Sequence, residues 1–288
     1  EAGGKVSQAM QAFRAFLGDS DMMAYLAMMA PRLVELRRVL KPTGSIYLHC
    51  DPTASHYLKM LMDSVFDPKS FRCDIRWKRT SAHGNVISNY AWVSDQLLFY
   101  TKGQKWTWNQ PYQPYDADYI ASHYGQMDGA RRFTTRDLTA SMQRASSGQI
   151  YEWKGVKPVP TRCWSFTKDR MEEFEAKGLL VYGQSGVPRL KLYLDEHSGT
   201  PTSDIWADIP PINSQAQERL GYPTQKPGAL LERILTASSN EGETVLDPFC
   251  GCGTTIAAAQ KLNRRWIGID ITTLAISLIR YRLADTYG

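Results

Sequence analysis

The sequence of 288 residues has no long apolar run: nowhere do about 18 consecutive residues stay apolar, as a membrane-spanning helix requires. It also lacks the basic start, apolar core and small-residue cleavage site of a secretory signal. Neither a membrane protein nor a secreted protein is therefore indicated. With 43% hydrophobic residues, the chain can form one α/β core plus an insertion, and a soluble cytoplasmic protein is expected.

Cysteine is scarce as well. The five cysteines, an odd number in a chain of this length, do not form a disulfide framework. Cys250 and Cys252 are separated by one residue and have no second pair of ligands elsewhere, so the spacing of a zinc site is missing. The sequence therefore predicts no bound metal.

The most informative segment lies near the C-terminal end. A short apolar strand at 244–246 runs into the glycine-rich turn 247–253, which opens a helix over 256–261. A second apolar strand at 266–269 ends on Asp270. Glycines let a ligand approach the backbone, a helix start offers free N–H groups, and a strand-end carboxylate can hold both hydroxyls of a ribose. This order of features predicts a nucleoside-binding site.

The turn lacks the third glycine of the G-x-G-x-x-G pattern that binds dinucleotides, because Gly253 is followed by two threonines. Upstream lies the segment Tyr222-Pro-Thr-Gln-Lys-Pro227. Together with Asp-Pro-Phe-Cys-Gly-Cys-Gly-Thr-Thr, it resembles motifs X and I of the β-class DNA amino-methyltransferases. The resemblance implies S-adenosylmethionine as the cofactor. It also implies which residues contact this cofactor: Asp247, Phe249, Gly251, Gly253, Thr254, Thr255 and Asp270, with Thr224, Gln225 and Lys226 at the edge of the pocket.

The rest of the chain follows the element order of the same class. The pattern predicts helices over 19–40 and 56–66, and strands over 45–51, 72–78 and 96–102 with a polar loop, 79–92, between the last two. Residues 1–18 show no convincing strand. Asp51, at a strand end, could face the cofactor or cap the next helix.

The resemblance implies an α/β, Rossmann-like methyltransferase fold. A mostly parallel twisted sheet would carry helices on both faces, and circular permutation would put the cofactor motif in the C-terminal part. Residues 1–104 would form the N-terminal part of the catalytic domain, without its first strand and catalytic loop. Residues 105–203 would form an inserted target-recognition region, and residues 204–288 the cofactor-binding part.

Charge is unevenly distributed in this chain of net charge +5. Residues 72–170 contain 15 Lys/Arg, 8 Asp/Glu and 16 aromatic residues. Interleaved basic and aromatic residues suit a nucleic-acid surface, because cations pair with phosphates and rings stack on bases. On composition alone, a Tyr-rich insertion with its own small core fits equally well. The resemblance favours double-stranded DNA, with Arg79, Arg131, Arg132 and Lys154 as candidate contacts.

One expected feature is absent. The resembled class uses a strand that ends in Asp, Asn or Ser followed by Pro-Pro and an aromatic residue, which together hold the target amine and base. In the β class this motif precedes a helix that corresponds to residues 19–40. No segment of residues 1–18 matches the motif. Asp208-Ile-Pro-Pro-Ile212 and Asn109-Gln-Pro-Tyr112 match imperfectly and are expected to be loops. The catalytic residues are therefore unknown from these 288 residues, and the motif is expected upstream of Glu1 or absent.

The resemblance implies methyl transfer from S-adenosylmethionine to the 6-amino group of adenine in duplex DNA, by base flipping and direct attack. The 4-amino group of cytosine is the alternative target, because the residue that decides lies in the missing motif. A methyltransferase for RNA or a small molecule, and a non-catalytic DNA-binding subunit, stay open as other functions. A restriction endonuclease or a second copy of the chain is a possible partner, and no membrane partner is expected.

Overall fold

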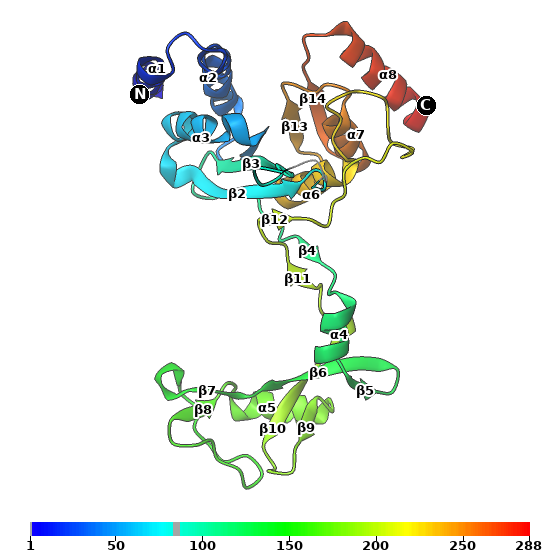
Figure 1. The fold of residues 1–288 in the computed structure, drawn as a ribbon. Helices are drawn as coiled ribbons and strands as arrows, with labels where there is room; N and C mark the ends of the chain where they lie inside the picture. Colours follow the sequence, from blue (N-terminus) through cyan, green and yellow to red (C-terminus); the bar gives the residue numbers. More distant parts are fainter. Residues whose placement is uncertain (1, 83–86) are drawn as a thin grey trace. The chain divides into compact units, whose positions relative to one another are not determined.

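The computed structural model describes residues 2–82 and 87–288 (Figure 1). Residues 83–86 of the predicted loop 79–92 lie outside the described part. The chain forms two compact units: Glu1–Pro111 with Thr202–Gly288, and Tyr112–Pro201. The second unit lies within the stretch 105–203 that the sequence suggested as an insertion. Among the described residues, no helix combines the length and apolar character needed to cross a membrane.

A four-stranded sheet forms the centre of the first unit. Its spatial order is β1 (Ser45–Cys50), β3 (Ser94–Thr101), β2 (Phe71–Lys78) and β12 (Ile205–Trp206). β3 pairs antiparallel with β1 and with β2, and β12 pairs parallel with β2. Three of the four strands therefore share one direction. Nearly every residue of β3 is buried, as expected for a strand covered on both faces of the sheet.

Three helices cover one face of this sheet: α1 (Ala2–Leu17), α2 (Asp21–Val39) and α3 (Pro52–Phe66). The predicted helices over 19–40 and 56–66 are confirmed as α2 and α3. We did not predict α1 from the sequence, although its apolar residues Val6, Met10, Phe13 and Leu17 recur at helical spacing. Val6 and Phe13 lie two turns apart on one side of α1, and both are buried against the neighbouring helices.

The other face is covered by α6 (Gly228–Ser238), whose Leu230 and Ile234 pack with Leu97 and Phe99 of β3. The chain continues through β13 (Thr244–Asp247), α7 (Thr254–Lys261), β14 (Arg265–Gly268) and α8 (Thr273–Tyr287), which confirms the predicted strand, turn, helix and strand. β13 and β14 pair in parallel as a separate two-stranded sheet. Leu235 joins α6 to a cluster with α7, so α6 packs against both sheets.

The second unit has its own antiparallel sheet, in the order β5 (Gln126–Asp128), β6 (Arg131–Asp137), β10 (Pro188–Tyr193) and β9 (Leu180–Tyr182). Outside it lie two pairs of strands. β7 (Thr139–Ser141) pairs with β8 (Arg162–Trp164), and β4 (Tyr112–Gln113) pairs with β11 (Thr200–Pro201). The helices are α4 (Ala117–His123) and α5 (Lys168–Ala176). Met171 and Phe174 of α5 pack with Trp153 and Trp164, so part of the aromatic content of 72–170 forms this unit's core.

Candidate cofactor site

The glycine-rich turn after β13 has the backbone that its sequence predicts. Gly251 and Gly253 have φ values of +49° and +78°, in the left-handed region that favours glycine. A Cβ atom on Gly253 would lie 2.5 Å from Cγ1 of Ile279, and one on Gly251 would lie 3.2 Å from Cε1 of Tyr222. The two glycines therefore allow α8 and Tyr222 to approach the turn. Gly253 is also the N-cap of α7, and without a side chain it leaves the first N–H groups of that helix uncapped.

Asp270 lies two residues after β14 and ties the second strand to the turn. Its Oδ2 accepts a hydrogen bond of 2.8 Å from Gly251 N, and its Oδ1 accepts two of 2.9 Å from N and Oγ1 of Thr272. Burial disfavours the charged form, but these hydrogen bonds outweigh it and hold the pKa of Asp270 below its usual value. The carboxylate is therefore ionised and fixed in orientation. A carboxylate has about four acceptor sites, and these three hydrogen bonds leave Oδ2 with capacity for one further donor, such as a hydroxyl of a ribose.

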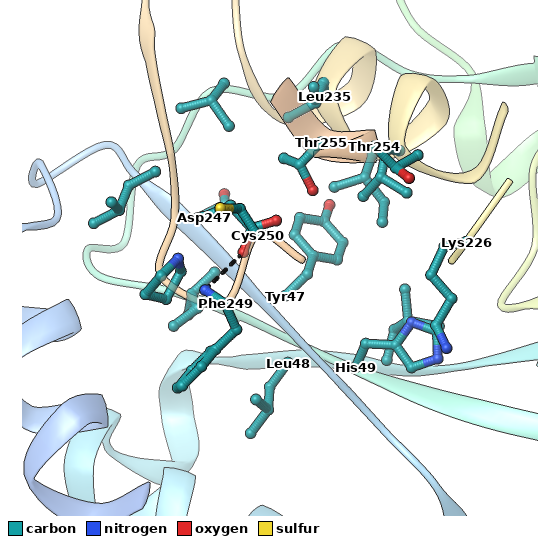
Figure 2. Close-up of a pocket in the computed structure, with 18 of the residues that line it drawn as sticks. Tyr47, Leu48, His49, Lys226, Leu235, Asp247, Phe249, Cys250, Thr254 and Thr255 are labelled. Atoms are coloured by element: carbon teal, nitrogen blue, oxygen red, sulfur yellow. Dashed lines mark hydrogen bonds between the residues drawn. The ribbon is translucent and has the colours of Figure 1, made fainter. Parts of the chain in front are cut away.

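A cavity of about 830 Å³ brings together most of the predicted cofactor residues (Figure 2). Eight of them line it: Asp247, Phe249, Gly251, Thr254, Thr255, Thr224, Gln225 and Lys226. The other two, Gly253 and Asp270, lie behind this lining as the N-cap of α7 and as the partner of Gly251. Phe249 is 48% exposed, and its N donates a hydrogen bond of 3.1 Å to Oδ1 of Asp247, the dashed line in Figure 2. Its ring is available to stack on a flat base.

The segment 222–227 is fixed at the edge of the cavity by its own hydrogen bonds. Gln225 donates from Nε2 to the carbonyl of Glu218 at 2.5 Å and accepts from Leu220 N at 2.8 Å. Glu218 in turn accepts a hydrogen bond of 3.0 Å from Gly228 N, at the start of α6. Gln225 therefore closes this loop onto α6 as well as lining the cavity.

Lys226 belongs to a charged cluster that the sequence did not predict. Its Nζ lies 3.8 Å from Oδ2 of Asp95, and the same oxygen lies 2.9 Å from Nε2 of His49. Nε of Arg79 lies 2.9 Å from the other oxygen of Asp95. Asp95, on β3, is 6% exposed, so one buried carboxylate joins β1, β3 and the segment before α6. Figure 2 shows Lys226 and His49 side by side at the cavity.

The surroundings of this cluster fix its protonation. Burial lowers the pKa of His49 below its usual value and outweighs the hydrogen bond with Asp95, which acts in the opposite direction. Burial alone would raise the pKa of Asp95, but the hydrogen bond with His49 and the cations Lys226 and Arg79 hold it below its usual value. At neutral pH, a neutral His49 therefore donates from Nε2 to an ionised Asp95.

Three positions considered as catalytic or cofactor candidates have structural roles. Asp51 accepts hydrogen bonds of 2.9 and 3.1 Å from main-chain N–H groups in the first turn of α3, so it is the cap, and it also lines the cavity. Asp208 forms an ion pair with Arg233. Asn109 donates from Nδ2 to main-chain carbonyls at the end of α6. Residues 208–212 and 109–111 of the two imperfect Pro-containing segments are therefore loops, as expected, and Tyr112 begins β4.

Three of the four candidate DNA contacts form ion pairs within the protein. Arg79 pairs with Asp95, and Arg131 lies 2.7 and 2.6 Å from two carboxylates of the turn 194–196. Lys154 lies 2.7 Å from a carboxylate of α5. Arg132 is exposed and has no ion-pair partner in the part of the chain that the structure describes. The exposed ion pairs of Arg131 and Lys154 contribute little stability, about 0–1 kcal/mol, so a phosphate could replace their acidic partners. Arg79 differs, because its partner Asp95 is buried and would lose one of its cations.

The second unit also contains a polar groove of about 520 Å³ that the sequence did not single out. Its lining includes Arg136, Arg144, Arg162, Thr139, Ser141, Gln143 and Ser165. Arg162 pairs with Asp137 at 3.1 Å, whereas Arg136 and Arg144 have no ion-pair partner among residues 2–82 and 87–288. Guanidinium and hydroxyl groups are common donors to phosphate oxygens.

The turn cysteines form no disulfide within the part of the chain that the structure describes. Cys250 and Cys252 are buried and unpaired, and burial raises the pKa of Cys250 to about 11. Its thiol is therefore protonated at neutral pH and packs as a small apolar group. Within the described residues, no group of three or more His, Cys, Asp or Glu side chains is arranged to hold a metal ion.

A parallel strand, a glycine-rich turn, a helix and a strand-end carboxylate around one cavity define a nucleotide-binding α/β fold of the methyltransferase class. The chain belongs to the family described as DNA methylase (N6_N4_Mtase), which it matches over residues 10–280. S-adenosylmethionine is the methyl donor of this family.

Known relatives agree with this assignment. The Type II methyltransferase M.EcaI of Enterobacter cloacae is 34% identical over 262 residues, 91% of this chain and 58% of the relative. DNA adenine methyltransferase YhdJ of Escherichia coli (strain K12) is 37% identical over 122 residues, 40% of this chain and 41% of the relative. The chain spans about half the length of the curated relatives it matches. Among solved structures, PvuII DNA methyltransferase (cytosine-N4-specific) shares the fold, with a TM-score of 0.53 at 13% identity over 94% of this chain and 74% of that chain.

Proposed function

We propose that this chain binds S-adenosylmethionine and takes part in the transfer of its methyl group to an exocyclic amine of a base in duplex DNA. The observation that carries the proposal is structural. The glycine turn and the segment 222–227 line one cavity, and Asp270 is bonded to that lining through Gly251. Membership of the DNA methylase family supports the reaction type.

The chain's own residues fit the parts of this cofactor. Asp270, ionised and held by Gly251 and Thr272, would accept from a ribose hydroxyl. The half-exposed ring of Phe249 stacks on the adenine. The uncapped N–H groups at the start of α7 suit the carboxylate of the methionine part. When bound, S-adenosylmethionine supplies a methyl group on a positively charged sulfur.

We propose the 6-amino group of adenine as the acceptor, with the 4-amino group of cytosine as the alternative. The name of the relative YhdJ, a DNA adenine methyltransferase, supports adenine. The name of the PvuII enzyme keeps cytosine open, although that likeness concerns the fold alone. Either base must rotate out of the duplex to present its amine, at a cost of a few kcal/mol in stacking and pairing.

The second unit is proposed to contact the DNA backbone. Arg132 and the groove residues Arg136 and Arg144 support this, because none of them has an acidic partner among the described residues. Arg131 and Lys154 stay candidates that would exchange an exposed acidic partner for phosphate. Arg79, in the first unit, also stays a candidate, but leaving the buried Asp95 without it makes that exchange costlier. A restriction endonuclease or a second copy of the chain stays a predicted partner, in line with the Type II relative.

A methyl-transfer assay with the natural full-length protein tests the proposed reaction. It is incubated with duplex DNA and S-adenosylmethionine labelled on the methyl group, and the DNA is then digested to nucleosides and separated. Label in N6-methyladenine is the expected result. Label only in N4-methylcytosine would show that cytosine, and not adenine, is the acceptor base, within the same class of reaction.

Two further outcomes of the same assay contradict the proposal. Binding of cofactor or DNA without any methyl transfer would identify a non-catalytic subunit. Transfer to RNA or a small molecule, together with DNA binding that does not weaken as salt rises, would exclude a DNA enzyme.

A further inference from the structure

The segment 87–92, in the loop between β2 and β3, presents large apolar side chains to solvent. Ile87 is 95% exposed, Tyr90 96% and Trp92 65%. None of the three belongs to a hydrophobic cluster in the described part of the chain. Single exposed apolar side chains are common on protein surfaces, but three within six residues indicate a surface that a partner covers.

The loop leaves the sheet at the edge of the cofactor cavity. Arg79 N donates a hydrogen bond of 2.9 Å to the carbonyl of Val93, just beyond the last paired residues of β2 and β3. Arg79 lines the cavity, and so does its buried partner Asp95. Trp92 directly precedes Val93, and Tyr90 lies three residues before it, so their Cα atoms are within about 4 and 11 Å of that of Val93. The exposed rings therefore lie near the cavity edge.

Charge around this segment has one sign. Between Asp74 and Asp95 the chain contains no acidic residue, whereas Arg76, Lys78 and Arg79 are basic. Lys78 is exposed and has no ion-pair partner among the residues that the structure describes. Cations pair with phosphates, and exposed rings stack on bases. The combination favours a nucleic acid over a second protein as the partner of the segment 87–92.

The proposed function gives rings at this place a physical role, and the inference rests on it. A base that rotates out of a duplex into the cavity loses its stacking and leaves a gap in the duplex at the cavity mouth. Proteins that open or kink DNA insert apolar side chains between base steps. A ring that stacks on the bases beside the gap would recover part of the lost stacking.

We propose that the segment 87–92 is a wedge that enters the duplex beside the rotated base. Tyr90 and Trp92 stack on the neighbouring bases, and Ile87 adds apolar contact. The wedge and the cavity both belong to the first unit, and Arg79 and Asp95 join them at the base of the loop. Opening of the duplex therefore depends on the first unit itself.

The salt dependence of DNA binding distinguishes stacking from phosphate contact. The natural full-length protein is used, with a duplex selected from random sequences by its binding to the wild type. Tyr90→Ala and Trp92→Ala are each expected to weaken binding at least about fivefold. The slope of log K against log salt should stay unchanged, because a ring releases no counterions. Fluorescence anisotropy at several salt concentrations measures both quantities.

Matched variants separate the ring from general effects of substitution. Tyr90→Phe and Trp92→Phe keep a ring and are expected to restore most of the affinity. Tyr281→Ala removes an exposed tyrosine of α8 and should bind as the wild type does. Because the replaced side chains are exposed, all five variants should unfold at the same temperature as the wild type.

A fluorescent base reports the opening of the duplex directly. 2-Aminopurine, which is quenched while it is stacked, is placed at each position of the selected duplex in turn. The wild type is expected to raise the fluorescence several-fold at one position. At saturating protein, Tyr90→Ala and Trp92→Ala should raise it less, whereas Tyr281→Ala should match the wild type.

Several results would overturn the wedge. These are unchanged affinity in both Ala variants, a loss that Phe does not restore, or a salt slope that falls by about 0.9, as for a phosphate contact. A change in oligomeric state without a change in DNA affinity would assign the segment to a second copy of the chain.

The outcomes also separate the wedge from the proposed function, because none of these readouts requires methyl transfer. A wedge found in a protein that transfers no methyl group would contradict the proposed reaction alone. Methylation of DNA by variants that bind and open the duplex like the wild type would contradict the wedge alone. A natural protein that binds no duplex DNA would contradict both.

Discussion

Two carboxylates near the cavity show how one side-chain type serves two purposes at the residue scale. Asp270 accepts from main-chain N–H groups behind the cavity lining and keeps capacity for a further donor. Asp95 is buried, and its two oxygens pair with His49, Arg79 and Lys226. The sequence predicted Asp270 because its position after a strand is a local pattern. It could not predict Asp95, because its partners are brought to it by folding from distant positions in the chain.

Asp270→Ala is expected to weaken binding of S-adenosylmethionine by about 1–3 kcal/mol, since the ribose would lose a charged acceptor. Titration calorimetry with the purified protein measures this. Asp285→Ala, an exposed acid on α8, is the matched control and should bind as the wild type does. Equal affinity of the Asp270 variant and the wild type would leave this carboxylate a purely structural role in holding the turn.

The neutral His49 makes stability depend on pH. Because its pKa in the folded state lies below the usual value, the unfolded chain binds more protons as the pH falls below about 6.5. The free energy of unfolding is therefore expected to decrease between about pH 7 and pH 5, and less so in His49→Gln, which keeps an N–H donor without titrating. Urea denaturation at each pH measures it, with His123→Gln as an exposed control. Identical slopes for wild type and His49→Gln would contradict the assignment.

At the scale of single elements, the sequence was reliable where a local rule operates. The glycine turn, its flanking strands and the helices α2 and α3 follow from short-range periodicity and from positive φ values that need glycine. α1 was not predicted, although Val6, Met10, Phe13 and Leu17 recur at helical spacing, and packing against α2 and α3 buries Val6 and Phe13. Tertiary packing, not propensity, stabilises such a helix.

The turn between β13 and α7 offers a test at this scale. Gly253→Ala combines an unfavourable positive φ with a clash against Ile279, whereas Gly242→Ala, at φ +74°, has nothing within 4 Å of its new Cβ. The first variant is expected to lose about 1–3 kcal/mol more stability than the second, the usual cost of overpacking. Thermal or urea unfolding of both proteins measures the difference. Equal losses would mean that α8 moves aside without cost.

At the scale of the whole molecule, the sequence was enough to predict the fold. It was not enough to predict which surface residues are available to contact DNA. Motif order was enough to predict the methyltransferase fold, because the cofactor turn and its strands are contiguous in the chain. Composition alone left the aromatic residues of 72–170 undecided, and the structure buries Trp153 and Trp164 in the core of the second unit. The candidate cations could not be ranked until their acidic partners were known, since ion pairs such as Arg131 with Asp195 join residues far apart in sequence.

DNA binding provides a prediction for the full protein. Arg132→Ala and Arg144→Ala should each weaken binding across sequences and lower the slope of log K against log salt by about 0.9, the loss of one phosphate contact. Fluorescence anisotropy at several salt concentrations measures the slopes. Arg170→Ala, which removes an exposed cation of α5 that does not line the groove and is not a candidate contact, is the control and should leave the slope unchanged. Unchanged slopes in the first two variants would remove these arginines from the DNA surface.

The short ladder between β4 and β11 has an evolutionary consequence. It holds the two ends of the second unit together, with Tyr112 opposite Pro201 and Gln113 opposite Thr200. A segment whose ends meet can be exchanged for another of different length without disturbing the chain on either side. Lineages could therefore exchange the second unit by recombination at these two points and keep the first unit, with its cavity, unchanged.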